Sequence, residues 1–141
     1  MTMKRHLTLH NDVQEVSLLA AFIDETAEEC GIDMATTMSL NLAMEEAVVN
    51  VMSYAYPADA VGDIDVDATF DDGVLTFVIS DSGKPFDPTK AGDPDITLDA
   101  EDRPIGGLGI FLVRNIMDTI EYQYSDNKNI LILGKKINSA G

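Results

Sequence analysis

Two pairs of strands, each pair joined by a tight turn, most constrain how this chain can fold. In the first pair, residues 64–69 alternate between apolar and polar side chains, and the turn Asp71-Asp72-Gly73 leads into the apolar run 74–80. In the second pair, the turn Ser125-Asp126-Asn127 joins strands at 120–124 and 130–136. Turns of this composition form β-hairpins, whose strands are antiparallel. The chain is therefore not expected to form a doubly wound parallel sheet.

The other segments predict one more strand and three helices. Residues 4–10 alternate as a short strand, and Asn11 and Asp12 supply an N-cap for a helix over about 13–30 that Gly31 ends. A second helix begins at Asp33 or Thr36 and runs to about Tyr54, and a third covers about 108–117. Grouped helices with hairpin-linked strands predict an α+β fold, a two-layer sandwich.

Composition limits what this single predicted domain, residues 1–141, can do. No run of about 18 apolar residues spans a membrane, and the start of the chain carries no secretion signal. A cytoplasmic location is expected, and the single Cys30 fits a reducing compartment. The net charge of −16 argues against direct nucleic-acid binding. It suits a basic protein partner, although solubility alone also explains it.

A first candidate site lies on the second predicted helix, in the segment Glu45-Glu46-Ala47-Val48-Val49-Asn50. Glu46 and Asn50 are four residues apart and therefore share one helical face. A carboxylate and an amide oxygen at a core edge could position a water or hydroxyl group and bind Mg²⁺, which prefers oxygen ligands. Taken alone, the pair also fits an ordinary exposed face of an amphipathic helix.

Two further candidate sites follow. Asp81 comes directly after the most apolar strand, where its carboxylate could accept a hydrogen bond from the amine of adenine and Gly83 would let backbone approach the base. Gly107 and Gly109 open the third helix, whose N–H groups could hold phosphates. A simple turn and a flexible hinge are the alternatives. The segment between them, about 82–109, is long and aperiodic, which is typical of a lid or binding loop.

The order of these motifs resembles the GHKL (histidine kinase-like, Bergerat-fold) ATPases. The segment MEEAVVNVMSYAYP resembles their N-box, DSGKPFDP their first glycine box and GGLGIFLVRNIMD their second. The run DSGKPFDP with the N-box helix is most similar to the anti-sigma serine kinases of bacterial partner-switching systems. Two positions depart from many relatives: Ser53-Tyr54 stand where a His is common, and the strand at Asn129 lacks the usual Thr.

This resemblance implies a role for each candidate residue. Glu46 would be the catalytic base and Asn50 the Mg²⁺ ligand. Asp81 and Gly83 would bind adenine, and Gly107 and Gly109 would bind phosphates. Residues 87–106 would form the ATP lid, and Lys84, Lys90 or Arg103 could lie near the γ-phosphate, although solvated lid positions explain these three as well. The sheet would be mixed and mostly antiparallel, with helices on one face.

The implied activity is an ATP-dependent serine kinase with Mg²⁺ as cofactor. Its substrate would be a STAS-domain anti-anti-sigma protein, with a sigma factor as a further partner and a homodimer as the assembly. One alternative is a non-catalytic module in which ATP gates sequestration of a sigma factor or STAS protein. A second is the catalytic domain of a histidine kinase, which would need a separate phosphoacceptor chain because His6 and His10 fall on the first predicted strand. A plain α+β protein without a nucleotide site is the third.

Overall fold

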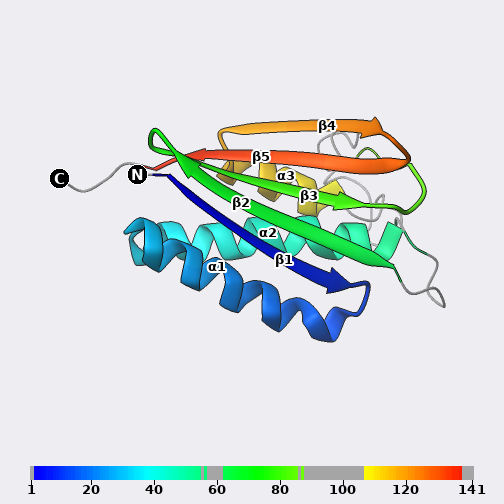
Figure 1. Cartoon of the computed structure of the whole chain (residues 1–141), viewed down its shortest axis with the longest axis horizontal. Helices are drawn as coiled ribbons and strands as arrows, with labels where there is room; N and C mark the ends of the chain where they lie inside the picture. The colour runs from blue at the N-terminus through cyan, green and yellow to red at the C-terminus, as the bar shows by residue number, and fades with distance from the viewer. Residues whose placement is uncertain (1, 55, 57–61, 86, 88–106, 138–141) are drawn as a thin grey trace, which may run out of the picture.

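A computed structural model describes residues 2–54, 56, 62–85, 87 and 107–137 of the chain (Figure 1). Its elements are β1 (Met3–His10), a 3-10 turn (Val13–Glu15), α1 (Val16–Cys30), α2 (Met34–Tyr54), β2 (Asp63–Asp71), β3 (Val74–Asp81), α3 (Gly107–Ile116), β4 (Thr119–Ser125) and β5 (Lys128–Lys136). The predicted order of strands and helices is confirmed. The first helix differs from the prediction only in its opening turn, which is a 3-10 turn rather than part of the α-helix.

The five strands form one sheet in the order β1-β2-β3-β5-β4, and all four pairings are antiparallel. The three helices lie on one face of this sheet (Figure 1). The predicted α+β two-layer sandwich is therefore confirmed, but the expected mixed sheet is not, because every strand pairing among the described residues is antiparallel. The β3–β5 pairing brings together two strands that belong to different hairpins, so that Asp81 lies opposite Asn129.

Local sequence explains where the elements begin and end. The Asp12 carboxylate accepts a hydrogen bond from the Gln14 N–H and caps the first turn. Gly31 ends α1 with a φ of 69°, a left-handed conformation that glycine adopts without steric cost. Both hairpin turns also contain left-handed residues, Asp72 and Gly73 in one and Asp126 and Asn127 in the other. This is the type I′ pattern that the turn composition predicts.

The core lies between the sheet and the helices. Every second side chain of β3 points into it, so Leu75, Phe77 and Ile79 are almost fully buried. From the helix layer, Met44 and Val48 of α2 pack into the same core with no exposed surface. Within the described residues, no helix is both long enough and apolar enough to cross a membrane.

Candidate functional site

The predicted site elements meet at one end of the molecule. The end of α2, the end of β3 and the start of α3 lie at the same end of the sandwich (Figure 1). A hydrogen bond confirms the first of these approaches: the Ser82 N–H, just after β3, donates to the Tyr56 hydroxyl, just after α2, at 2.9 Å. The three sequence motifs are therefore neighbours in the fold, although they span more than 60 residues of sequence.

Asp81 is a buried carboxylate at the last position of β3, with only 3% of its surface exposed. Its Oδ1 accepts two hydrogen bonds, from the Gly83 N–H at 2.9 Å and from the Asn129 amide at 2.9 Å. No other hydrogen bond to this side chain comes from the described residues, and among them Oδ2 has no partner. Buried polar atoms are normally paired, so this oxygen is a candidate acceptor for a ligand.

The ionisation of Asp81 is set by competing effects. Burial raises the pKa of its carboxyl group, because the charged form loses hydration, whereas the hydrogen bonds from Asn129 and Gly83 lower it. Burial is the larger effect. Asp81 therefore costs stability when charged, which is common for a residue retained for binding rather than for folding.

The loop after Asp81 is a tight turn that bonds back to the carboxylate. The Gly83 N–H donates to the side chain two residues earlier, as in an Asx turn. The two sequence interpretations of this segment, a turn and a binding loop, are thus compatible. The Lys84 side chain is exposed, and the backbone carbonyl oxygen of Lys84 accepts a hydrogen bond from the Asn129 side chain.

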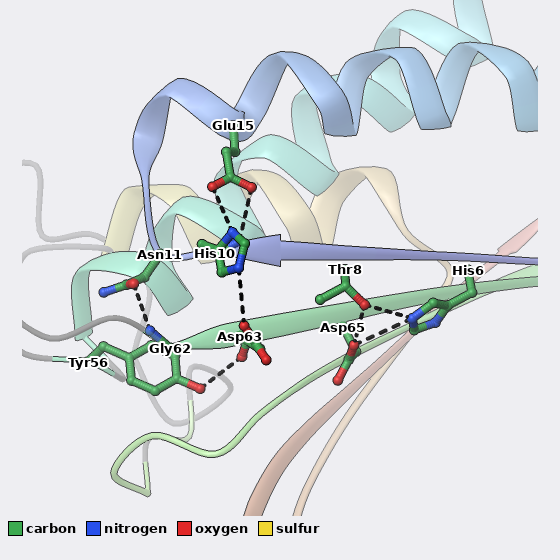
Figure 2. Close-up of polar contacts among 9 residues, drawn as sticks. All are labelled: His6, Thr8, His10, Asn11, Glu15, Tyr56, Gly62, Asp63 and Asp65. Carbon is green, nitrogen blue, oxygen red and sulfur yellow. Dashed lines mark hydrogen bonds and ion pairs between the residues drawn. The ribbon is translucent and has the colours of Figure 1, made fainter.

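Tyr56 ties this loop to two other elements. Its hydroxyl accepts the Ser82 N–H and donates to the carbonyl oxygen of Asp63 at the start of β2, at 2.8 Å (Figure 2). A side chain at Gly62 would overlap the Tyr56 ring, so glycine is required there. Asn11 accepts the Gly62 N–H and donates its own N–H to the Gly62 carbonyl. Asn11 was predicted as part of the helix cap, which Asp12 alone forms.

The N-box residues lie in the last three turns of α2. Asn50 is 8% exposed, yet none of the hydrogen bonds within the described residues involves its side chain. A buried amide without a partner can accept a ligand, and an amide oxygen is a suitable donor to Mg²⁺. Glu46 is partly exposed one turn earlier, whereas Glu45 is exposed.

The structure describes only some of the residues that were predicted to bind phosphates or to form the lid. Gly107 and Gly109 occupy the first turn of α3, as predicted for residues that open a helix. Of the predicted lid, 87–106, only Asp87 lies within the described residues, and Lys90 and Arg103 lie outside them. In the described part of the chain, no group of three or more His, Cys, Asp or Glu side chains could hold a metal ion. Mg²⁺ bound with a nucleotide needs no such group, because phosphates and waters complete its shell.

Two residues of this site, Asn129 and Tyr122, were not predicted from sequence. Asn129 is 5% exposed and donates to Asp81 Oδ1 and to the Lys84 carbonyl, and its own oxygen accepts the Tyr122 hydroxyl. A signal for Asn129 exists in the sequence: it continues the buried phase of β5, Asn129-x-Leu131-x-Leu133, in which a polar residue needs a partner. We call Asp81, Asn129 and Tyr122 the buried polar cluster.

A second group of polar side chains lies on the open face of β1 and β2. The His6 ring lies 2.7 Å from the Asp67 carboxylate. It also contacts Thr8 and Asp65, and His10 contacts Glu15 and Asp63 (Figure 2). We call His6, Thr8 and Asp65 the exposed polar cluster. Both histidines are on β1, where they were predicted, and their side chains are about half exposed.

These features define a class of protein: an α+β sandwich with a buried carboxylate, a helix-borne Glu–Asn pair and a glycine-initiated helix at one end. The model of the histidine kinase-like ATPase domain matches residues 9–135. The chain belongs to the histidine kinase-like ATPase domain family.

Individual relatives agree with this assignment. The serine-protein kinase RsbW of Listeria monocytogenes is 30% identical over 127 residues, which cover 87% of this chain and 80% of the relative. RsbW of Bacillus cereus is 26% identical over 121 residues, with 83% and 75% covered. A crystal structure of the RsbU and RsbW domains of Rv1364c from Mycobacterium tuberculosis has a TM-score of 0.69 at 18% identity. It covers 96% of this chain but 32% of that longer chain, and it supports the fold alone.

Proposed function

We propose that this protein is an ATP-dependent serine kinase that phosphorylates a STAS-domain anti-anti-sigma partner and acts as an anti-sigma-type regulator. The observation that carries the proposal is that one end of the sandwich holds a buried carboxylate, Asp81, and a buried amide, Asn50. Among the described residues, Oδ2 of Asp81 and the amide of Asn50 have no hydrogen-bond partner. Membership of the ATPase family and the serine-kinase names of the relatives support it.

Each residue takes one role in this proposal. Asp81 accepts the exocyclic amine of adenine through Oδ2, and the turn at Gly83 allows the base to approach. The backbone of Gly107 and Gly109 binds phosphate oxygens at the start of α3, where the helix dipole favours negative charge. Asn50 supplies an oxygen ligand to the Mg²⁺ that accompanies ATP. This ion would neutralise charge on the phosphates, which an acidic protein of net charge −16 otherwise repels.

The proposed reaction is a transfer of the γ-phosphoryl group to a serine hydroxyl. Glu46 accepts the hydroxyl proton as the new O–P bond forms, and the bond between the γ-phosphorus and the bridging oxygen breaks to release ADP. Glu46 suits this role because it lies one turn before Asn50 on α2 and is partly exposed, so a partner's serine can reach it. Substitution of Lys84, Lys90 or Arg103 by Ala would test whether any of these side chains stabilises charge on the γ-phosphate.

The partners follow from the same role. We expect a STAS-domain protein as the substrate, a sigma factor as a further partner and a homodimer as the assembly, acting in the cytoplasm without contacting nucleic acid directly. An acidic surface favours a basic sigma region, so raising the salt concentration should weaken that complex. Salt-independent binding would contradict the electrostatic part of the proposal, and sedimentation as a monomer at high concentration would contradict the dimer.

The decisive experiment is phosphoryl transfer from labelled Mg-ATP to the STAS protein encoded nearest to this one. The variants are Glu46→Gln, Asn50→Ala and, as a matched control, Glu45→Gln, which changes an exposed neighbour on the same helix turn. We expect Glu46→Gln to bind ATP normally and lose about 100-fold or more of the transfer rate, as removal of a general base does. Asn50→Ala should weaken both binding and transfer, and Glu45→Gln should leave both unchanged.

Other outcomes separate the alternatives. If the wild-type protein binds ATP and the STAS partner but transfers no phosphate, it is an ATP-gated binding module. If Glu45→Gln, rather than Glu46→Gln, abolishes transfer, the assignment of the base is wrong. If ATP does not bind at all, the nucleotide site itself is wrong.

A further inference from the structure

Asn129 lies at the point where the second hairpin meets the first. It is the second residue of β5, and its Cα pairs with that of Asp81 across the antiparallel β3–β5 ladder. The two side chains are both in the buried phase of their strands. A polar side chain here must be hydrogen-bonded within the protein, because it is 5% exposed and burial without a partner is costly.

The Asn129 amide uses both of its donor hydrogens and its oxygen. Its Nδ2 donates to Asp81 Oδ1 at 2.9 Å and to the Lys84 carbonyl at 2.8 Å, and its Oδ1 accepts the Tyr122 hydroxyl. Chemistry fixes this orientation: a flipped amide would set its oxygen against a carboxylate and a carbonyl, neither of which can donate. Tyr122 reinforces it by donating to the amide oxygen.

This arrangement determines which carboxylate oxygen of Asp81 meets a ligand. The donors from Asn129 and Gly83 both bind one oxygen, Oδ1, so they fix the plane of the carboxylate and keep its second oxygen pointing in one direction. The second bond of Asn129, to Lys84, holds the loop that follows Asp81 against β5. The Asn129 amide therefore holds both the Asp81 carboxylate and the loop that follows it.

We propose that Asn129, oriented by Tyr122, is the positioning residue of base recognition, presenting Asp81 Oδ2 to a hydrogen-bond donor on the nucleotide base. The proposal rests on the proposed function, in which this base is adenine. An oxygen held in one orientation selects a purine with an amino group at C6, because that amine donates. A purine without the amine leaves Oδ2 buried and unpaired, which costs the binding that the amine supplied.

The test compares ATP with purine riboside triphosphate, which lacks only the 6-amino group, by equilibrium binding with Mg²⁺ present. In the wild type we expect loss of the amine to weaken binding about tenfold or more, the effect of one unmade buried hydrogen bond to a charged group. Asn129→Asp keeps the shape but sets two carboxylates together, and Tyr122→Phe removes only the hydroxyl. Both should bind ATP more weakly and lose much of the discrimination, with Tyr122→Phe the milder of the two.

Tyr124→Phe is the matched control, because Tyr124 lies on the same strand, is 44% exposed and pairs across the ladder with Asn129. It should change neither affinity nor discrimination. A purely structural role for Asn129 would weaken both nucleotides equally and leave their ratio intact, and that result would overturn the proposal. If Asn129→Asp does not fold, Tyr122→Phe carries the test alone. If the wild type prefers ATP to purine riboside triphosphate and Tyr122→Phe keeps the same ratio of affinities, Tyr122 does not orient Asn129. A wild type that binds neither nucleotide contradicts the proposed function instead.

Discussion

The buried polar cluster and the exposed polar cluster use similar contacts but differ in what surrounds them. In the buried polar cluster, Asn129 meets Asp81 at 2.9 Å. In the exposed polar cluster, the Thr8 hydroxyl donates to Asp65 at 2.8 Å, on neighbouring antiparallel strands of the same sheet. Asp81 is 3% exposed, whereas the Asp65 side chain is 32% exposed. The geometry of each hydrogen bond is therefore ordinary, and burial makes the difference.

Burial changes the consequence of leaving an acceptor open. In the exposed polar cluster, water can replace any partner, so a lost hydrogen bond costs little and no particular ligand is selected. In the buried polar cluster, water is largely excluded and Oδ2 of Asp81 needs a donor of the right shape. The same residue types thus form a recognition site in one place and a solvated surface in the other.

The largest effect should follow from replacing the buried carboxylate. In Asp81→Asn the amide oxygen can still accept from Gly83 and Asn129, but its NH₂ group then faces the adenine amine, donor against donor. We expect ATP affinity to fall about 100-fold, measured by equilibrium binding, since a charged acceptor is lost and a clash is added. Asp65→Asn, the same change on the exposed face, should alter affinity less than about twofold. Equal effects of the two substitutions would contradict the comparison.

The same Asp81→Asn variant should be more stable than the wild type at neutral pH. Burial raises the folded-state pKa of Asp81 above its ordinary value of 3.8, so the folded protein binds this proton more tightly than the unfolded chain. The wild type therefore loses stability as pH rises from 3.8 through the raised folded-state pKa, and the asparagine variant does not. We expect a stability advantage at neutral pH that disappears on acidification.

Urea unfolding of both proteins across this pH range is the measurement. The difference between the two curves isolates Asp81 from the other acidic residues, which are common to both. An advantage that grows as pH falls would have the wrong sign and would mean that hydrogen bonding, not burial, dominates the ionisation of Asp81.

The sequence predicts the elements of this fold better than it predicts the completed site. Periodicity and turn composition locate the strands and helices, and Asp81 is recognisable because it ends an apolar strand. Asn129 is 48 residues away from Asp81 and on another hairpin, so its partner depends on the pairing of β3 with β5. No local pattern specifies that pairing.

Tyr56 links the loop beside the buried polar cluster to the start of β2, the strand that carries Asp65. Removal of its hydroxyl should therefore have an intermediate effect on stability and ATP affinity. Its hydroxyl bonds Ser82 beside Asp81 and the backbone of Asp63 at the start of β2. Tyr56→Phe keeps the ring over Gly62 and leaves the Ser82 N–H without this partner, so we expect a loss of about 1 kcal/mol in unfolding free energy. ATP affinity should fall severalfold because the loop after Asp81 loosens. Tyr124→Phe, again at an exposed ring, controls for removal of a hydroxyl alone. Unchanged ATP affinity in Tyr56→Phe would show that the loop is held without it.

The smallest effect should come from the exposed polar cluster itself. His6 is about half exposed and contacts Thr8 and Asp65 (Figure 2). It also contacts Asp67, whose side chain is about half exposed, so water can replace His6 at each of these partners. We expect His6→Ala to change the free energy of unfolding by less than about 0.5 kcal/mol and to leave ATP binding and phosphoryl transfer unchanged. A loss of transfer with stability intact would instead show that the open face of β1 and β2 takes part in function. The exposed polar cluster would then not be merely a solvated surface.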